Sequence, residues 1–124
     1  MKKALTLFGI VALAATSFLS LDLSAEAAKS QCASGSGCIW RDINFSGGLL
    51  HAISTPSWTS YSAGTNDLAS SLYNNSTRDV AWYSDHGLQG GRKCAKPNHQ
   101  LHSLSGTWND SISSVIMYSG TKYC

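Results

Sequence analysis

The chain has 124 residues and a formal net charge of +2, and 13% of its residues are charged. This length suits one small domain. The net positive charge is small, and the lysines and arginines are scattered along the chain. We therefore expect neither nucleic acid nor a membrane surface as a partner.

The first 27 residues have the pattern of a secretory signal peptide. Lys2 and Lys3 precede an uncharged apolar run over 4–19, and Ala25-Glu26-Ala27 fits a small-x-small cleavage site. We expect cleavage after Ala27 or Ala28 and a secreted mature domain over residues 28–124. The alternative is an uncleaved membrane anchor, for which the apolar run is marginal in length.

All four cysteines lie in the predicted mature domain, at Cys32, Cys38, Cys94 and Cys124. An even number in a small secreted chain predicts two disulfides, and four cysteines allow three pairings. We favour Cys32–Cys38 with Cys94–Cys124, because closing the short loop between the first two cysteines costs the least entropy. Zinc is the rival interpretation, and the absence of any Cys-x-x-Cys pair from the sequence argues against it.

Short segments rich in aromatic and β-branched residues predict strands along the rest of the chain. They form two sets with the same order: a strand, a turn ending in Gly-Gly, a second strand, a polar stretch and a last strand. No long segment after the leader has helical periodicity, so we predict an all-β fold. The predicted strands cover 38–42, 49–53 and 71–73 in the first set and 80–84, 92–95 and 115–118 in the second, with 74–79 as connector.

The polar stretch Asn-Asp-x-x-Ser-Ser begins at Asn66 and occurs again 43 residues later, at Asn109. At the same offset Trp40 aligns with Tyr83, and the glycine pair 47–48 aligns with 90–91. Propellers and helical arrays with repeats of about forty residues need three or more copies. Two copies in one small domain instead predict two Greek-key units, over about 32–77 and 78–124, packed as a disulfide-stapled β-sandwich.

Each polar stretch brings amide, carboxylate and hydroxyl oxygens together within six residues, which suits a hard cation such as calcium. A single copy is more simply a polar turn that hydrogen-bonds its own backbone. In that alternative, Ser70 and Ser113 cap the turn while Ser71 and Ser114 bond neighbouring backbone. The repetition favours the ion site.

Two further patterns point to a known family. Trp40-x4-Phe45-x-Gly47 and Tyr83-x4-Leu88-x-Gly90 resemble the aromatic-x4-aromatic-x-Gly signature of βγ-crystallin Greek keys, with Leu88 replacing the second aromatic residue. The Asn-Asp-x-x-Ser-Ser stretches resemble the calcium motif of that superfamily. The opening Cys32-x5-Cys38-Ile39-Trp40 resembles peptidase inhibitor family 36, whose type member is a bacterial metalloproteinase inhibitor of βγ-crystallin-like fold.

This resemblance implies two calcium ions, each lying between the two Greek keys. It implies an acidic or amide side chain at the second motif position, a hydroxyl at the fifth, and backbone carbonyls from the motif and from the turns over 40–47 and 83–90. The metal-binding residues predicted in this way are Asn66, Asp67, Ser70, Asn109, Asp110 and Ser113.

The resemblance also implies inhibition of a peptidase, with a secreted protease as partner. As a hypothesis, the basic segment containing Arg92, Lys93, Ala95 and Lys96 forms an inhibitory loop, rigidified by a disulfide at Cys94. The alternative is a solvated hairpin edge whose lysines discourage strand pairing.

No set of residues in the sequence predicts an enzyme. The pair His99-x2-His102 lacks the Glu of a zinc peptidase motif, and no Gly-x-Ser-x-Gly nucleophile turn occurs. Of the four tryptophans, Trp58 is the one we expect to be exposed. We therefore predict a secreted, monomeric, calcium-binding peptidase inhibitor; the alternatives are a calcium-stabilised structural or stress protein and a secreted toxin or antimicrobial of the same fold.

Overall fold

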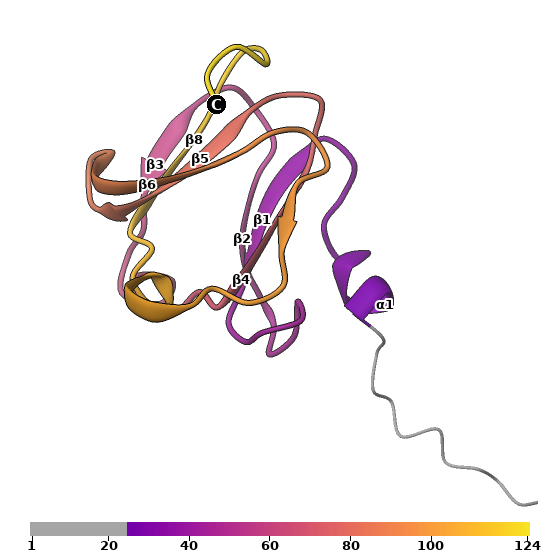
Figure 1. Ribbon diagram of the computed structural model, residues 1–124, viewed down its shortest axis with the longest axis vertical. Helices are drawn as coiled ribbons and strands as arrows, with labels where there is room; N and C mark the ends of the chain where they lie inside the picture. The colour runs from indigo at the N-terminus through magenta and orange to yellow at the C-terminus, as the bar shows by residue number, and fades with distance from the viewer. Residues whose placement is uncertain (1–24) are drawn as a thin grey trace, which may run out of the picture.

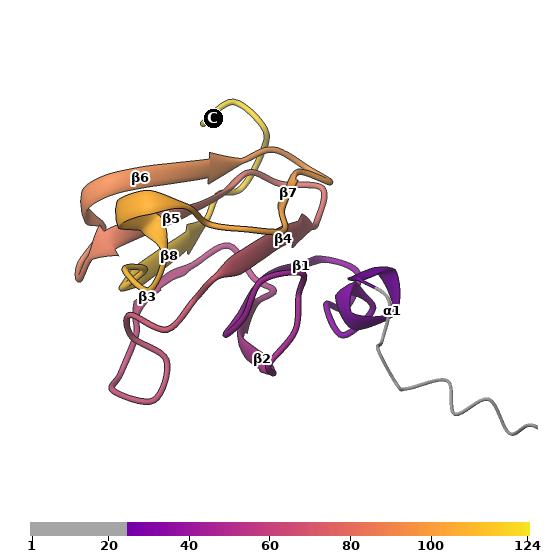
Figure 2. The ribbon, with the colours of Figure 1, turned by 60° about the horizontal axis from the view of Figure 1, so that its bottom comes forward.

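The computed structural model describes residues 25–124, which fold into two four-stranded antiparallel sheets packed face to face (Figure 1). The predicted signal peptide lies outside the described residues except for its last three positions. These begin the short helix α1 (Ala25–Lys29), which lies beside β1 (Figure 2). Among residues 25–124, no helix is long and apolar enough to span a membrane.

The first sheet has the strand order β2-β1-β4-β7. Its strands are β1 (Ser36–Trp40), β2 (Leu49–Ile53), β4 (Ser71–Asn75) and β7 (Gln100–Leu101). The second sheet has the order β3-β8-β5-β6, with β3 (Trp58–Ser60), β5 (Val80–Asp85), β6 (Gln89–Ala95) and β8 (Ser114–Met117). A 3-10 turn, η1 (Gly106–Trp108), follows β7.

The two repeats exchange their third strands. The short strand β3 comes from the first repeat but pairs with β8 of the second, whereas β7 comes from the second repeat and pairs with β4 of the first. Each sheet therefore holds three strands of one repeat and one strand of the other. The predicted all-β sandwich of two Greek keys is confirmed, with the addition that the two keys interlock.

The main core lies between the sheets, where period-two alternation turns Val80 and Trp82 of β5 inward against Leu72 of β4 and Val115 of β8. A second cluster beside α1 contains Ala28, Trp40 and Phe45 around the first disulfide. Trp40 and Trp82 are fully buried, and Trp108 packs partly buried against the main core. Trp58 is 56% exposed, as predicted.

The connector between the repeats is shorter than predicted, because β4 continues through Asn74 and Asn75. The side chain of Asn74 is fully buried, and its Nδ2 donates to the carbonyls of Arg78 and Ala95 at 2.7 and 2.8 Å. Its Oδ1 accepts from the Oγ of Ser76 at 2.6 Å. This buried amide thus meets its hydrogen-bonding needs inside the fold, which explains why a turn-prone residue is found in a strand.

Both favoured disulfides are present. Cys32 and Cys38 lie 5.9 Å apart between their Cα atoms, and Cys94 and Cys124 lie 5.3 Å apart. The first bond closes the loop before β1. The second ties β6 to residues 118–124, which follow β8.

Candidate calcium sites and inhibitory segment

The two Asn-Asp-x-x-Ser-Ser stretches lie side by side and bond to each other through their backbones. The N–H of Asp67 donates to the carbonyl of Ile112 at 3.1 Å, and the N–H of Asp110 donates to the carbonyl of Ala69 at 3.0 Å. Both aspartates have left-handed backbones, with φ of 58° and 57°. Asp tolerates this conformation better than most residues, which suits it to this motif position.

The side chains of the two motifs pair reciprocally. The Oγ of Ser113 donates to Oδ1 of Asp67 at 3.0 Å, and the Oγ of Ser70 lies 3.5 Å from Oδ1 of Asp110. Each carboxylate therefore meets the hydroxyl of the other repeat. The sequence predicts Asp67, Asp110, Ser70 and Ser113 as calcium ligands, but it does not show that each aspartate lies beside the serine of the other repeat.

The motif asparagines orient the aspartates. Nδ2 of Asn66 donates to Oδ2 of Asp67 at 3.0 Å, and Nδ2 of Asn109 donates to Oδ2 of Asp110 at 3.2 Å. Oδ1 of Asn66 is buried and has no hydrogen-bond partner among the described residues. A buried oxygen that lacks a donor is costly in a folded protein, and a bound cation would satisfy it.

These oxygens fit calcium and do not fit zinc. Within residues 25–124, no group of three His, Cys, Asp or Glu side chains could hold a metal ion. Each paired site instead offers one carboxylate, one hydroxyl and nearby amide and carbonyl oxygens, which are ligands that calcium accepts. The carboxylates of Asp67 and Asp110 are exposed at the surface, so an ion could reach them from solvent.

The last serine of each motif has a role that the sequence did not reveal. Oγ of Ser71 donates to the carbonyl of Asp42 at 2.7 Å and accepts from the N–H of Phe45 at 3.1 Å. Ser114 does the same in the other repeat, with Asp85 at 2.6 Å and Leu88 at 3.0 Å. In the polar-turn alternative these serines bond backbone, and they do so here, but to groups 26 and 29 residues away in the chain. Each serine thus clamps the folded hairpin turn between the first two strands of its repeat.

The hypothesis of an inhibitory loop around Cys94 needs correction. Arg92, Lys93 and Ala95 belong to β6, the edge strand of the second sheet, and Ala95 is buried in the core. Lys96 directly follows the strand. The structure thus matches the alternative, an edge strand with basic side chains, because the pairing of β6 with β5 extends from Gln89 to Ala95.

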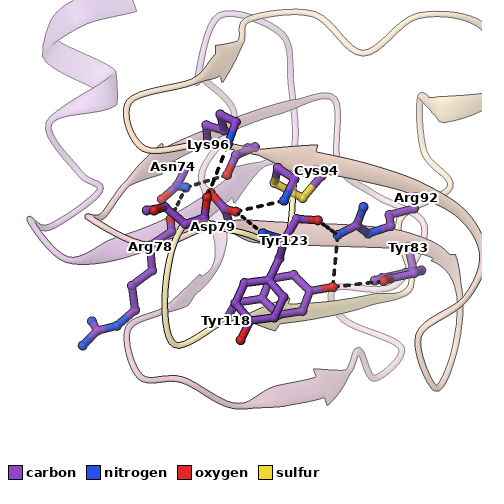
Figure 3. Close-up of a disulfide and its surroundings, with 12 residues drawn as sticks. Asn74, Arg78, Asp79, Tyr83, Arg92, Cys94, Lys96, Tyr118 and Tyr123 are labelled. Atoms are coloured by element: carbon purple, nitrogen blue, oxygen red, sulfur yellow. Dashed lines mark hydrogen bonds between the residues drawn. A yellow bond between two sulfur atoms is a disulfide. The ribbon is translucent and has the colours of Figure 1, made fainter.

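Sequence reasoning also missed the role of Asp79, which it assigned to the connector. The side chain of Asp79 is fully buried, and its Oδ2 accepts from the N–H groups of Tyr123 and Cys124 at 2.8 and 2.9 Å (Figure 3). Asp79 has no acidic counterpart in the other repeat, where the aligned position, 43 residues earlier, is Ser36. No signal in the sequence marks it, because its partners are backbone groups 44 and 45 residues away.

Comparison of the sequence with known proteins identifies a family. The family model described as peptidase inhibitor family I36 matches residues 25–95, more than half of the chain. No curated protein matches the chain in sequence.

Solved βγ-crystallin domains share the fold. A structure from work on the evolution of the eye-lens βγ-crystallin domain fold is 22% identical and has a TM-score of 0.58, covering 68% of this chain and 86% of that one. A double mutant of a βγ-crystallin domain from Clostridium beijerinckii is 25% identical with a TM-score of 0.57, covering 68% and 97%. The N-terminal domain of Protein S is 20% identical with a TM-score of 0.56, covering 69% and 98%. The chain has the βγ-crystallin fold and belongs to peptidase inhibitor family I36.

Proposed function

We propose that the protein is an extracellular inhibitor of a peptidase and that calcium stabilises its domain. The match of the family model over residues 25–95 carries the inhibitor assignment, since it includes α1, the first repeat and the β5-β6 hairpin of the second. Inhibition also agrees with the lack of a catalytic set of residues in the sequence.

The reciprocal pairs support calcium binding. One ion would be held by Asp67 and Ser113 and the other by Asp110 and Ser70, with Asn66 and Asn109 beside them. Each site has one formal negative charge and otherwise neutral oxygens. Calcium affinity rises with ligand charge and rigidity, so we expect dissociation constants of roughly 10⁻⁴–10⁻³ M, the range of extracellular modules.

Calorimetric titration of paired variants tests this arrangement. Asp67→Ala with Ser113→Ala removes one site and should leave one calcium per chain, whereas Asp67→Ala with Ser70→Ala damages both sites and should leave none. The two double variants lose the same kinds of group, so each is the control for the other. Equal stoichiometry in both would contradict the cross-repeat sites, and a wild-type protein that takes up no calcium would contradict binding altogether.

Export agrees with the leader sequence and with the two disulfides, since such bonds persist in oxidising compartments. The structure favours one of the two expected cleavage positions. Ala28 is 3% exposed and packs in the cluster with Trp40 and Phe45, whereas Ala27 is exposed. Cleavage after Ala27 would keep the buried methyl group, so mass spectrometry of the exported protein should give Ala28 as its first residue.

Inhibition is tested by titrating the mature protein against a panel of secreted metallo- and serine peptidases. Loss of activity at one inhibitor per enzyme is the expected result for at least one of them. If no peptidase is inhibited in the presence of calcium, the second candidate, a calcium-stabilised structural protein, becomes the better account. The observation that favours this candidate is the cross-repeat pairing itself, because an ion at each pair would join the two repeats.

A further inference from the structure

The outer face of the second sheet carries aromatic and apolar side chains. The solvent-facing side of an antiparallel sheet normally carries polar ones. Trp58 pairs with Ile116, Ile116 with Ala81, and Ala81 with Cys94, so these residues form one row across the four strands. The row lies on the side of the sheet opposite the core, because its neighbours Val80, Trp82, Val115 and Met117 face the core. Within the row Trp58 is exposed, Ile116 and Cys94 are half-buried, and Ala81 is covered. Directly opposed residues share a face, so Trp58 and Ile116 lie together on this surface.

Aromatic residues extend this row towards residues 118–124. Tyr118 follows Met117 and therefore lies on the same side as Ile116, and its ring stacks on that of Tyr123 with centroids 4.3 Å apart. Tyr83 and Arg92 are opposed on β5 and β6. We call this surface the aromatic face and define it as Trp58, Tyr83, Arg92, Ile116, Tyr118 and Tyr123.

The aromatic face is held rigid by several contacts (Figure 3). Nη2 of Arg92 donates to the carbonyl of Tyr123 at 2.7 Å and to the hydroxyl of Tyr118 at 3.2 Å. The hydroxyls of Tyr83 and Tyr118 lie 3.4 Å apart. Beneath them, the buried Asp79 and the Cys94–Cys124 disulfide fix residues 123 and 124. Side chains that are already ordered lose little entropy when a partner binds.

The rim of the aromatic face is basic. Arg92, Lys96 and Lys122 are exposed there, and Lys96 Nζ lies 3.5 Å from the carbonyl of Thr121. The side-chain carboxylate of Asp79, which contacts residues 123 and 124, is buried and accepts their backbone N–H groups. Asp85 lies two residues after Tyr83, at the end of β5 away from Lys96, and Asp67 and Asp110 lie in the calcium motifs. The charge at the rim would therefore complement a partner that presents carboxylates.

We propose that the aromatic face is the surface with which the protein docks onto its peptidase, and that the peptidase presents an acidic patch to it. This inference rests on the proposed inhibitory function and goes beyond it by naming the contact surface. Tyr, Trp and Arg are the residues that most often dominate the energetics of protein interfaces. Here Trp58 and Tyr123 are 56% and 46% exposed and Arg92 is exposed, while Tyr83, Ile116 and Tyr118 beside them are half-buried.

Inhibition constants of matched variants test the proposal with a peptidase that the wild-type protein inhibits. Trp58→Ala and Tyr123→Ala should each raise the inhibition constant about tenfold or more, as loss of an interface hot spot does. Ile43→Ala is the control, because Ile43 is 50% exposed but lies in the hairpin turn of the first repeat. Melting temperature with calcium present verifies that each variant is folded.

A charge reversal tests the proposed attraction between the basic rim and an acidic patch of the peptidase. Lys122→Glu should weaken inhibition at low ionic strength, and the effect should shrink as salt is added, because salt screens exposed charges. Arg41→Glu makes the same charge change in the first repeat and should leave the inhibition constant unchanged.

The outcomes separate the two proposals. If the wild-type protein inhibits a peptidase and Trp58→Ala, Tyr123→Ala and Lys122→Glu all keep its inhibition constant, the docking surface is wrong and the inhibitory function stands. If the wild-type protein inhibits none of the panel, the inhibitory function fails and the docking surface fails with it.

Discussion

At the residue scale, Asp79 shows how one buried carboxylate holds a segment distant in sequence. It accepts the backbone N–H groups of both Tyr123 and Cys124, while its own N–H donates to the carbonyl of Gly120 at 2.8 Å. Asp79→Ala would leave these two part-buried N–H donors without their acceptor. We expect the free energy of unfolding to fall by about 2–3 kcal/mol, the usual value for hydrogen bonds to a charged group.

Urea denaturation with both disulfides intact measures this loss. The matched control is Asp85→Ala on the same strand, since Asp85 is exposed and a surface change of this kind costs less than about 0.5 kcal/mol. If both variants lost the same free energy of unfolding, the hydrogen bonds of the buried Asp79 would add no stability beyond that of an exposed aspartate.

His51 on β2 makes stability depend on pH. Its ring packs edge-on against Tyr61 with centroids 4.9 Å apart, and burial lowers the pKa of His51 below its ordinary value of 6.5. The unfolded chain therefore binds a proton at a higher pH than the folded chain does. The contribution of His51 is fully present above pH 6.5 and is lost as pH falls from there through the lowered pKa of the folded state.

Melting temperature measured between pH 8 and pH 5 should consequently decline on the acid side, and His51→Phe should flatten that decline while keeping an aromatic ring against Tyr61. A variant whose acid decline is as steep as that of the wild-type protein would assign the effect to other groups.

At the element scale, each folded hairpin turn depends on one serine from a distant strand. Ser71 is fully buried and bonds two backbone groups of the turn between β1 and β2, and Ser114 does so for the turn between β5 and β6. Ser71→Ala and Ser114→Ala should each reduce the free energy of unfolding by about 1–3 kcal/mol, because each leaves a backbone donor and an acceptor unpaired.

Chemical denaturation of the two variants checks this, with Ser103→Ala as a control at an exposed loop position. Hydrogen exchange adds a local measure, because the amide proton of Phe45 should lose protection in Ser71→Ala and that of Leu88 in Ser114→Ala. Unchanged protection in both would mean that the turns hold their shape without the clamps.

The elements that the sequence predicts are those with a strong local pattern. The aromatic and β-branched strands β1, β5 and β8 were expected close to their observed positions, and so were both disulfides. The third strands β3 and β7 have three and two residues, too few for a period-two pattern. Their exchange between sheets, the pairing of Asp67 with Ser113 and the contacts of Asp79 all join residues far apart in the chain, and no local spacing encodes such contacts.

At the scale of the whole molecule, the exchange of β3 and β7 makes the two repeats depend on each other. Each sheet needs a strand from the other repeat, and the inward side chains Leu72, Trp82 and Val115 from both repeats share one core. The proposed calcium sites have the same property, because each takes its carboxylate from one repeat and its hydroxyl from the other. The repeats are therefore units of sequence rather than units of folding.

Separate expression of residues 28–77 and 78–124 tests this conclusion. Each half keeps its own disulfide, yet each should be unfolded alone, since its apolar sheet face and its third strand lack partners. Calcium should not rescue either half, because neither contains a complete site. Mixing the halves with calcium should restore a dispersed amide NMR spectrum. A dispersed spectrum from one half alone would show that a single repeat can form a stable core, and the interlocked strands would then be an outcome of folding and not a condition for it.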